Sequence, residues 1–585
     1  MSGQRLEYHY HRLLAQFPSG EATITLQALA DGLCCSKRHM RTLLSNMQQR
    51  GWLYWQATAG RGHQARLSLL RDKQQLKVEK ADQLLKKGDI AAAVELLDDE
   101  KNQLASLLRS RLGYRVNDDY QSLHVPYYRA MPNLYPGTPL RRSEIHLVRQ
   151  IFNGLTRINT QTGEVESDLA HRWRQQDTLH WRFFLRPGVR FHDGHLLNSE
   201  DVVVSLNRCA RLPLFSHIDQ VTSSGSLVVD VALTQEDPQL PLLFTDPAAL
   251  ILPGDHDQRE NFAAYPIGTG PWRVSENNQW HLLLQVFEQY FALRGLLDEI
   301  EVIVWPEMTH ETDQEPSLPT NQSAAWLSSS INDAAWASRV TAPFTTTSSE
   351  PHTEMFLEQG GYFLLCDSRS VHWHTVQQRR WLREKLSPWR LAQYLQDAVR
   401  PLWVPTGSLL PAWFHSIETG ESRSPFVGGQ NHAVLRLAYP HQHPEYARLA
   451  AIMRQLLATE DVMLEVLELD YEQWAMGDAD VDLWLGTVNF PVPETWSVGT
   501  WLLGMPLLQY GLFGGDRQQY QYCQQKWRQG KLSSWQLTQK IIASGWLQPL
   551  FHHWMRLKAP ENSQGIHLNN LGWFDFSTTW MEPGA

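Results

Sequence analysis

The chain has 585 residues, enough for about three to five domains of ordinary size, and its composition is 42% hydrophobic and 19% charged. These proportions are typical of a folded globular protein and exclude an intrinsically disordered chain. The net charge of −10 is unevenly divided, because residues 1–72 hold nine Lys or Arg against four Asp or Glu, whereas the remainder carries −15. A basic N-terminal region (the head, residues 1–72) joined to an acidic remainder (the body) indicates two functions in one polypeptide, and the positive charge of the head suits a partner that carries phosphate groups.

Cysteine usage and the first residues of the sequence favour a cytoplasmic location. The five cysteines are few and odd in number, which argues against a disulfide scaffold and fits a reducing compartment. The N-terminal residues lack the apolar stretch and the cleavage site of a secretory signal. No run of 18 apolar residues occurs, so we expect no membrane span and no membrane partner.

Residues 1–72 predict a DNA-binding domain built around two helices. In residues 25–33 the apolar side chains form one stripe, Thr25 is available as the N-cap, and Cys34-Cys35 makes a short turn. Ser36 is the expected N-cap of a second helix, which runs from Lys37 to Met47. The inward face of this helix carries Met40, Leu43, Leu44 and Met47.

The outward face of the second helix is polar and basic near its N-terminal end. Two helices of this length across a three- or four-residue turn make a helix-turn-helix, whose second helix enters the major groove of DNA by its N-terminal residues. The candidate DNA contacts on this helix are Ser36, Lys37, Arg38, Arg41, Thr42 and Ser45. A solvated basic face is the alternative, and contacts to phosphate are not distinguished from contacts to bases.

A two-stranded hairpin is predicted after the second helix. Gly51 is placed to end the helix, an aromatic strand follows it, and residues 66–70 alternate into a returning strand. The hairpin tip between the strands contributes Arg61 and His63 as further candidate DNA contacts. A helix-turn-helix followed by such a hairpin is a winged helix, whose wing commonly reaches the DNA backbone or the minor groove.

Residues 73–113 predict a helical connector. Leucine and alanine recur at helical spacing among many charges, and Lys87-Gly88-Asp89 breaks the pattern. Two helices joined by a tight turn are therefore expected. A hairpin that serves dimerisation is the alternative.

Three segments characterise the rest of the chain, residues 114–585. Residues 181–194 read as an alternating strand, a Pro-Gly turn and a second strand that ends in Asp-Gly. Residues 198–208 read as a helix capped by Asn198 or Ser199. Residues 266–272 form a rigid Gly/Pro turn that opens a strand.

Together these segments resemble the extracytoplasmic solute-binding proteins of the oligopeptide/nickel type. The resemblance extends over most of the chain and implies a two-lobed α/β body, periplasmic-binding-protein-like of type 2, cluster C, whose lobes close on a ligand by a hinge motion. The expected fold is therefore multidomain, with an α+β winged helix-turn-helix domain joined to this body. The three segments themselves are expected to be structural.

A winged helix joined to such a body resembles the SgrR family of transcriptional regulators. The matching residues lie at 35–44, at Arg141-Arg142-Ser143-Glu144 and at 571–576. The resemblance implies a regulator that senses a metabolite of sugar-phosphate stress, activates a small-RNA gene and an adjoining transport operon, and represses its own gene. The implied partners are double-stranded DNA, a small-molecule effector and RNA polymerase.

One departure from the solute-binding pattern bears on the effector. Peptide-binding members of that class often carry an aspartate that pairs with the ligand's ammonium, and Asn489 stands at the corresponding place in residues 486–493. A buried ammonium without a carboxylate partner is costly. We therefore expect an uncharged or anionic small molecule that Asn489 contacts, with a structural role for Asn489 in its loop as the alternative.

Enzymatic motifs are missing from the sequence. His192 with His195, and His552 with His553, are possible metal pairs, but no further ligand follows at a usable spacing. The chain has no G-x-S-x-G elbow, no P-loop and no H-E-x-x-H. We expect no catalysis, no metal and no cofactor.

Two functional hypotheses follow. In the first, ligand closure of residues 114–585 is passed through residues 73–113 to a DNA-binding head. In the second, the chain is a transport-associated solute receptor whose head is a protein-interaction module. The second hypothesis predicts a periplasmic or membrane-attached protein.

Overall fold

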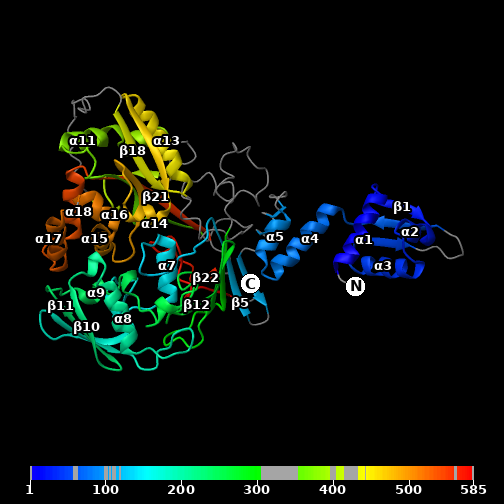
Figure 1. The fold of residues 1–585 in the computed structure, drawn as a ribbon, viewed down its shortest axis with the longest axis horizontal. Coiled ribbons are helices and arrows are strands. Elements are labelled where there is room, and N and C mark those ends of the chain that lie inside the picture. Colours follow the sequence, from blue (N-terminus) through cyan, green and yellow to red (C-terminus); the bar gives the residue numbers. More distant parts are fainter. Residues whose placement is uncertain are drawn as a thin grey trace. The chain divides into compact units, whose positions relative to one another are not determined.

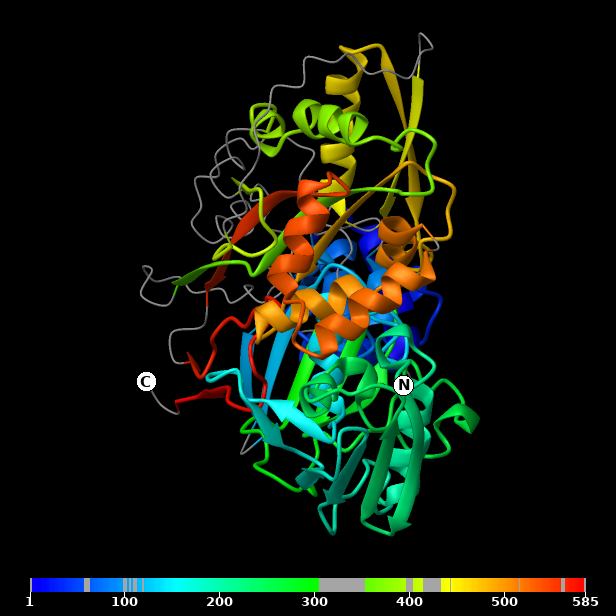
Figure 2. The same ribbon diagram turned by 90° about the vertical axis from the view of Figure 1, so that its left-hand side faces the viewer.

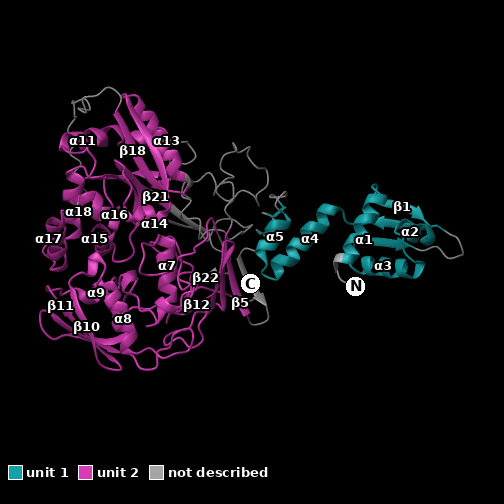
Figure 3. Cartoon of the chain, in the orientation of Figure 1, with its two compact units in different colours: residues 1–111 teal, residues 112–585 magenta. Residues whose placement is uncertain are grey.

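The computed structural model describes residues 3–56, 64–97, 103–104, 107–108, 113–117, 120–304, 353–395, 403–413, 433–441, 443–514, 516–558 and 563–582. The chain divides into two compact units, residues 1–111 and 112–585 (Figure 3). The predicted head and most of the predicted connector share the first unit. A functional boundary at residue 72 therefore stays a prediction.

The head has the predicted winged-helix order, preceded by one helix and one strand that the sequence reading did not include (Figure 1). Its three strands form an antiparallel sheet in the order β1-β3-β2. Gly51 follows the second predicted helix with a φ of 69°, a left-handed conformation that suits glycine. The elements are α1 (Gly3–Gln16), β1 (Glu21–Ile24), α2 (Leu26–Gly32), α3 (Lys37–Gln49), β2 (Leu53–Gln56) and β3 (Ala65–Leu69).

Apolar spacing along α1 and α3 builds the core of the head. The side chains that these two helices bury together are Leu6, Tyr10, Leu13, Met40, Leu43, Leu44 and Met47. The Tyr10 hydroxyl donates to the backbone carbonyl of Trp52 at 2.5 Å and accepts from the backbone N–H of Arg71 at 3.2 Å. These bonds satisfy a buried phenol and fix α1 to the end of the hairpin.

The two helices that the leucine spacing predicts follow the head, and residues 103–104 and 107–108 beyond them are helical as well. The two predicted helices are α4 (Lys73–Lys86) and α5 (Ile90–Leu96). Gly88 in the turn between them has a φ of 81°. A salt bridge of 3.4 Å from Lys80 to Glu7 joins α4 to α1. The first part of the predicted connector is thus packed on the head.

The described residues of the body form three main sheets. The first has the order β12-β13-β14-β5-β4 and consists of β4 (Gly113–Asn117), β5 (Tyr120–Tyr127), β12 (Trp272–Asn277), β13 (His281–Val286) and β14 (Glu299–Val304). The second has the order β10-β11-β9-β8 and consists of β8 (Ala170–Gln175), β9 (His180–Leu185), β10 (Ile218–Gly225) and β11 (Val228–Leu233). The third has the order β15-β21-β16-β20-β18-β19, with β17 paired to β21, and consists of β15 (Thr353–Leu357), β16 (Gly360–Cys366), β17 (Trp403–Pro405), β18 (Ala433–Pro440), β19 (Val462–Leu469), β20 (Leu483–Asn489) and β21 (Leu547–Lys558).

Two short strand pairs and a set of helices complete the body. The short pairs are β6 (Thr156–Ile158) with β7 (Val165–Ser167), and β22 (Ser563–Gln564) with β23 (Trp580–Met581). The first helices are α7 (Arg142–Ile151), α8 (Ser199–Cys209), α9 (Leu240–Leu243), α11 (Val376–Lys385), α12 (Pro388–Ala392) and α13 (Pro444–Ala458), with 3-10 turns η1 (Pro213–Phe215), η2 (Pro247–Ala249) and η3 (His256–Gln258). The later helices are α14 (Tyr471–Met476), α15 (Glu494–Gly504), α16 (Pro506–Phe513), α17 (Arg517–Arg528) and α18 (Ser534–Ala543).

Each sheet of the body packs on helices, which gives three hydrophobic cores. The first sheet packs on α7 and on the C-terminal residues 566–576. The second sheet shares its core with α8 and with the cluster of α15 to α18, which lie together in both ribbon views (Figures 1 and 2). The third sheet packs on α11, α12 and α13, and α13 runs beside β18 (Figure 1).

Several predicted motifs of the body are confirmed and one is wrong. Asn198 caps α8, as predicted. Farther along the chain, α13 connects β18 and β19, which pair in parallel. The strand expected after the Pro-Gly turn at residue 188 is reduced to an isolated bridge between Arg190 and Leu196. Gly268 is required in its turn, because a Cβ there would lie 2.0 Å from the carbonyl oxygen of Ile151. None of the helices in the described part of the chain combines the length and the hydropathy of a membrane span.

Candidate functional site

The outward face of α3 is the first candidate site. Ser36 caps this helix, as predicted, by accepting a hydrogen bond of 3.2 Å from the backbone N–H of His39. The predicted contact residues are all exposed on it, namely Ser36, Lys37, Arg38, Arg41, Thr42 and Ser45. The buried side chains of α3 point to the opposite side, so a partner can approach this face without disturbing the core.

The basic side chains of this face are available to an anion. Within the described residues Lys37, Arg38 and Arg41 form no ion pair, and the first turn of α3 holds no acid. By contrast, Arg66 on β3 is paired with Glu21 at 3.2 Å. The N-terminal end of α3 therefore combines free cations with the positive end of the helix dipole.

The wing is described only in part. Strands β2 and β3 form the predicted hairpin, with Tyr54 opposite Ser68 in the register. Arg61 and His63 at its tip lie outside the described residues. Their contacts with DNA stay predictions.

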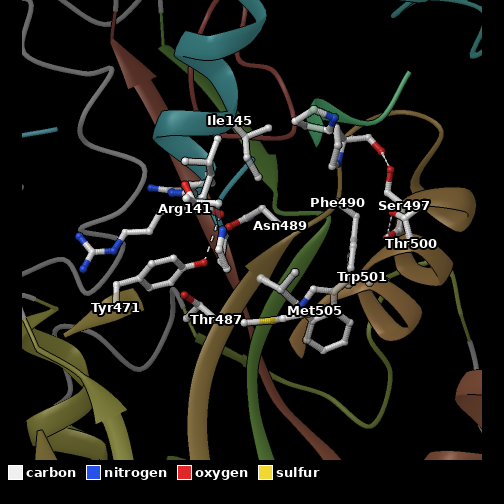
Figure 4. Close-up of a pocket in the computed structure, with 18 of the residues that line it drawn as sticks. Arg141, Ile145, Tyr471, Thr487, Asn489, Phe490, Ser497, Thr500, Trp501 and Met505 are labelled. Carbon is white, nitrogen blue, oxygen red and sulfur yellow. Dashed lines mark hydrogen bonds between the residues drawn. The ribbon is translucent and has the colours of Figure 1, made fainter. Parts of the chain in front are cut away.

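The second candidate site is a cavity of about 620 Å³ in the body. It is lined by the chain around the start of α7, by α14, by the end of β20 and by α15 and the start of α16 (Figure 4). Its volume is in the range of small-molecule sites in proteins. Since its walls come from the parts of the body that carry the first and the third sheets, the cavity lies between two lobes, as the resemblance implied.

One end of the cavity is rich in arginine. Four arginines line it, Arg129, Arg141, Arg142 and Arg149. Arg129 is buried and forms a bidentate pair with Glu144, with Nη–Oε distances of 2.5 and 2.9 Å. Burial, the largest single effect, opposes the ionisation of Glu144, but the charge and hydrogen bonds of Arg129 together with the charge of Arg141 outweigh it and lower the pKa of this carboxyl.

Arg141 and Tyr471 bring the two lobes together beside the cavity. The guanidinium carbon of Arg141 lies 4.7 Å from the centroid of the Tyr471 ring (Figure 4). The Tyr471 hydroxyl donates to the backbone carbonyl of Leu140 at 3.1 Å. Because Leu140 precedes α7 and Tyr471 begins α14, this contact spans the mouth between the lobes.

Asn489 lies in the cavity wall (Figure 4), and its side chain is hydrogen-bonded to a carboxyl group. Its side-chain amide donates to Oε2 of Glu358 at 3.0 Å, and the backbone N–H of His553 donates to Oε1 at 2.8 Å. Glu358 is only 4% exposed. Burial raises the pKa of Glu358 to about 7, against the opposing effects of Asn489, Arg142 and the His553 amide.

Neutral hydrogen-bonding groups continue this polar surface. The Tyr446 hydroxyl and the Thr487 hydroxyl lie 2.9 Å apart. Burial, reinforced by the nearby arginines, lowers the pKa of His443 to about 3, so its imidazole is neutral at physiological pH. These groups suit hydroxyls of a ligand, since each can donate or accept.

The other end of the cavity is apolar. Phe490, Trp496, Trp501 and Met505 contribute to its lining. The Trp501 ring lies 5.6 Å from that of Phe490 in an edge-to-face arrangement. The cavity thus offers charge at one end and a hydrophobic wall at the other.

Asn489, predicted from the sequence as a ligand contact, lines the cavity, and its role there stays a prediction; most of its neighbours were not predicted. Arg141, Arg142 and Glu144 belong to a segment that matches the SgrR family pattern. The match pointed to these residues but did not indicate what they do. No such match pointed to Glu358. From the sequence we expect no carboxyl group beside the ligand at Asn489. Glu358, which lies between β15 and β16, supplies a carboxyl group at this place and corrects that expectation.

The two histidine pairs have structural partners. His192 donates from Nε2 to the carbonyl of Gly270 at 3.0 Å, and its Nδ1 accepts from the N–H of Gly268 at 3.2 Å. His552 Nδ1 contacts the carbonyl of Gly360. No cluster of three or more His, Cys, Asp or Glu suited to a metal is found in the described ranges.

Two family models match the chain. "Sugar transport-related sRNA regulator N-term" covers residues 5–119, and "Bacterial extracellular solute-binding proteins, family 5 Middle" covers residues 164–318. Among relatives, the HTH-type transcriptional regulator SgrR of Escherichia coli K12 is 39% identical over 583 residues, with 100% of both chains covered. The SgrR of Photorhabdus laumondii is 38% identical over the same span, again with both chains fully covered.

Solved structures match the fold of the body. The PBP AgaA of A. tumefaciens R10, in complex with agropinic acid, has a TM-score of 0.61 at 14% identity, and covers 79% of this chain and 99% of its own. DppA of Helicobacter pylori, an ABC transporter-associated periplasmic binding protein in complex with peptide STSA, has a TM-score of 0.61 at 14% identity, with 79% and 98% covered. At this identity the likeness concerns the fold alone.

A winged-helix head joined to a body with the solute-binding fold defines a class of DNA-binding regulators with a solute-binding-like body. The relatives identified are regulators and solute-binding proteins. With 39% identity over the full length of both chains, this chain belongs to the SgrR family of HTH-type transcriptional regulators.

Proposed function

We propose that the chain binds double-stranded DNA through the outward face of α3 and the wing. The observation that carries this proposal is a row of exposed cations without ion pairs among the described residues, at the N-terminal end of a capped helix. Such an end enters the major groove in helix-turn-helix proteins. The proposed contacts are Ser36, Lys37, Arg38, Arg41, Thr42, Ser45, Arg61 and His63.

The body is proposed to sense an uncharged or anionic metabolite in the cavity, with Asn489 among its contacts. Arg141, Arg142 and Arg149 support an anionic group, whereas the charge of Arg129 is balanced by Glu144, and the neutral hydroxyls and imidazole support hydrogen bonds to an uncharged portion. By family resemblance, the metabolite arises in sugar-phosphate stress. No catalytic step is proposed, since binding alone suffices for a sensor.

The output is proposed to be transcriptional. Ligand closure of the lobes shifts the head through residues 73–113 toward the state that activates a small-RNA gene and an adjoining transport operon, and the chain represses its own gene. Activation requires contact with RNA polymerase. These steps place the protein in the cytoplasm.

Titration of the full chain against the DNA upstream of its own gene, at several salt concentrations, tests the DNA-binding proposal. Arg38→Ala and Arg41→Ala each remove one proposed cationic contact, so each should lower affinity several-fold, and a variant that loses a phosphate contact should also reduce the slope of log affinity against log salt by about 1. Fluorescence anisotropy gives both quantities.

Lys86→Ala is the matched control. It removes one exposed cation from α4, where Lys86 pairs with Asp82 at 2.7 Å, and so changes the net charge equally. Its salt slope should equal that of the parent chain. Equal losses in all three variants, or no binding by the parent chain, would contradict the proposed surface.

A further inference from the structure

Glu358 has an unusual position for a carboxyl group. It lies in the wall of the cavity and yet is 4% exposed, between β15 and β16. The protein supplies each of its oxygens with one hydrogen-bond donor, from Asn489 and from the backbone of His553. An ionised carboxylate in such a place is expensive unless a full cation pairs with it.

The charged and titratable groups around Glu358 come from three elements. Arg142 on α7 acts on it through its charge, and His553 on β21 has Nδ1 3.9 Å from Oε1. Burial, together with the charges of Glu445 and Glu358, raises the pKa of Tyr362 on β16, and the Tyr362 hydroxyl donates a hydrogen bond to Glu445. No salt bridge closer than this 3.9 Å contact reaches Glu358 from the described residues.

We propose that Glu358 is a specificity residue of the effector cavity that carries a proton when the effector binds and donates a hydrogen bond to it. This inference rests on the proposed sensing function and names the chemistry of its contact. A protonated carboxyl offers one O–H donor, which suits a hydroxyl or an anionic oxygen, whereas a carboxylate repels the anion that the arginines attract.

The direction of the pH dependence follows. Burial raises the pKa of Glu358 to about 7. Above that pH Glu358 is ionised in the ligand-free protein, so binding of an effector that requires the protonated carboxyl must be accompanied by uptake of a proton. Affinity therefore falls with rising pH, by about tenfold per pH unit well above the pKa.

Isothermal titration of the full chain with glucose 6-phosphate between pH 7 and 9 tests the ligand side. This range lies above the second phosphate pKa of about 6, so the charge of the probe is nearly constant. The parent chain should lose about tenfold in affinity per unit above pH 8. Glu358→Gln, which mimics the protonated acid, should keep its affinity within about twofold across the range.

Glu465→Gln is the matched control, because Glu465 on β19 is an exposed carboxyl group of the same body and is not among the residues that line the cavity. It should follow the parent chain. A parent affinity that is flat with pH, or a fall that persists in Glu358→Gln, would overturn the inference.

Thermal unfolding without ligand separates this inference from the effector proposal. Unfolded Glu358 ionises near pH 4.5 and the folded residue near 7, so its contribution to stability is full below 4.5 and is lost as pH rises to 7. The Tm of Glu358→Gln should therefore rise by a few degrees relative to the parent between pH 4.5 and 7.5. If glucose 6-phosphate binds no variant, the sugar-phosphate proposal fails, and this comparison still decides whether Glu358 holds its proton.

A second variant protects the test against misfolding of Glu358→Gln. Asn489→Leu removes the donor to Oε2 and raises the pKa of Glu358 further. The loss of Tm with pH should then extend to higher pH than in the parent chain. An unchanged profile would contradict the proton-bearing role.

Discussion

Arg129 lies buried beside two tyrosine rings and one carboxylate, at the wall of the cavity. Its guanidinium carbon is 5.3 Å from the centroid of the Tyr127 ring and 5.8 Å from that of Tyr128. Only Glu144 pairs with its charge among the described residues. A buried pair of this kind adds little net stability, but either charge alone is strongly destabilising.

Glu144→Gln should therefore lower the free energy of unfolding of the body by about 3–5 kcal/mol, because Arg129 keeps a charge that no carboxylate balances. Urea denaturation of the full chain measures the change. The double variant Arg129→Met with Glu144→Leu should recover most of the loss.

The control for this change is Glu166→Gln, which breaks an exposed pair with Arg157 at 3.3 Å. Exposed pairs are screened by water and contribute little, so the unfolding midpoint should not move. A loss in Glu144→Gln no larger than in this control would show that the buried charge is compensated in another way.

At this scale the limits of sequence reasoning are visible in two neighbours. Asn489 could be predicted as a ligand contact because residues 486–493 correspond to a short sequence motif of the peptide-binding proteins. Glu358 lies 131 positions away along the chain and reaches Asn489 only because β16 pairs with β20 in the third sheet. A contact made by long-range strand pairing has no local pattern, so the pH-sensitive partner could be found only in the structure.

Among elements, the head shows what local signals achieve. Caps at Thr25 and Ser36, the apolar stripe of α3 and the glycine after it are all local, and each was predicted correctly. Helix α1 was missed although Leu6, Tyr10 and Leu13 follow helical spacing. Tyrosine and histidine weaken a hydrophobic pattern, and the buried role of Tyr10 becomes clear only from its bonds to the hairpin.

The cap of α3 also has a measurable consequence. Ser36→Ala removes the acceptor for the His39 amide and should destabilise the first turn by about 1 kcal/mol, which corresponds to roughly five-fold faster amide exchange there. Hydrogen exchange with mass spectrometry on the full chain reports this turn, and DNA affinity should fall in parallel because Lys37 and Arg38 depend on its geometry.

Ser36→Asn keeps a side-chain acceptor at the cap and is the comparison variant. It should restore slow exchange. If exchange in the α3 peptide is equal in Ser36→Ala and in the parent chain, the cap does not govern the DNA-facing turn.

At the scale of the whole molecule, the chain joins two compact units with separate hydrophobic cores. The fold of both could be predicted from word-like motifs and periodicity. The coupling between effector binding in the body and DNA binding by the head does not depend on any single local segment, so a sequence motif does not reveal it. The Tyr471 hydroxyl donates to the carbonyl of Leu140 between the lobes, so a movement of one lobe relative to the other would break this bond.

If open and closed states of the body differ in DNA affinity, effector and DNA must influence each other equally. Saturating effector should change the affinity for upstream DNA by a factor between about 5 and 150, and saturating DNA should change the affinity for the effector by the same factor. Anisotropy measures the first factor and isothermal titration the second, both on the full chain. Tyr471→Phe, which loses only the bond to Leu140, should reduce both factors together. An effector that binds tightly and leaves DNA affinity unchanged would mean that lobe closure is not the signal.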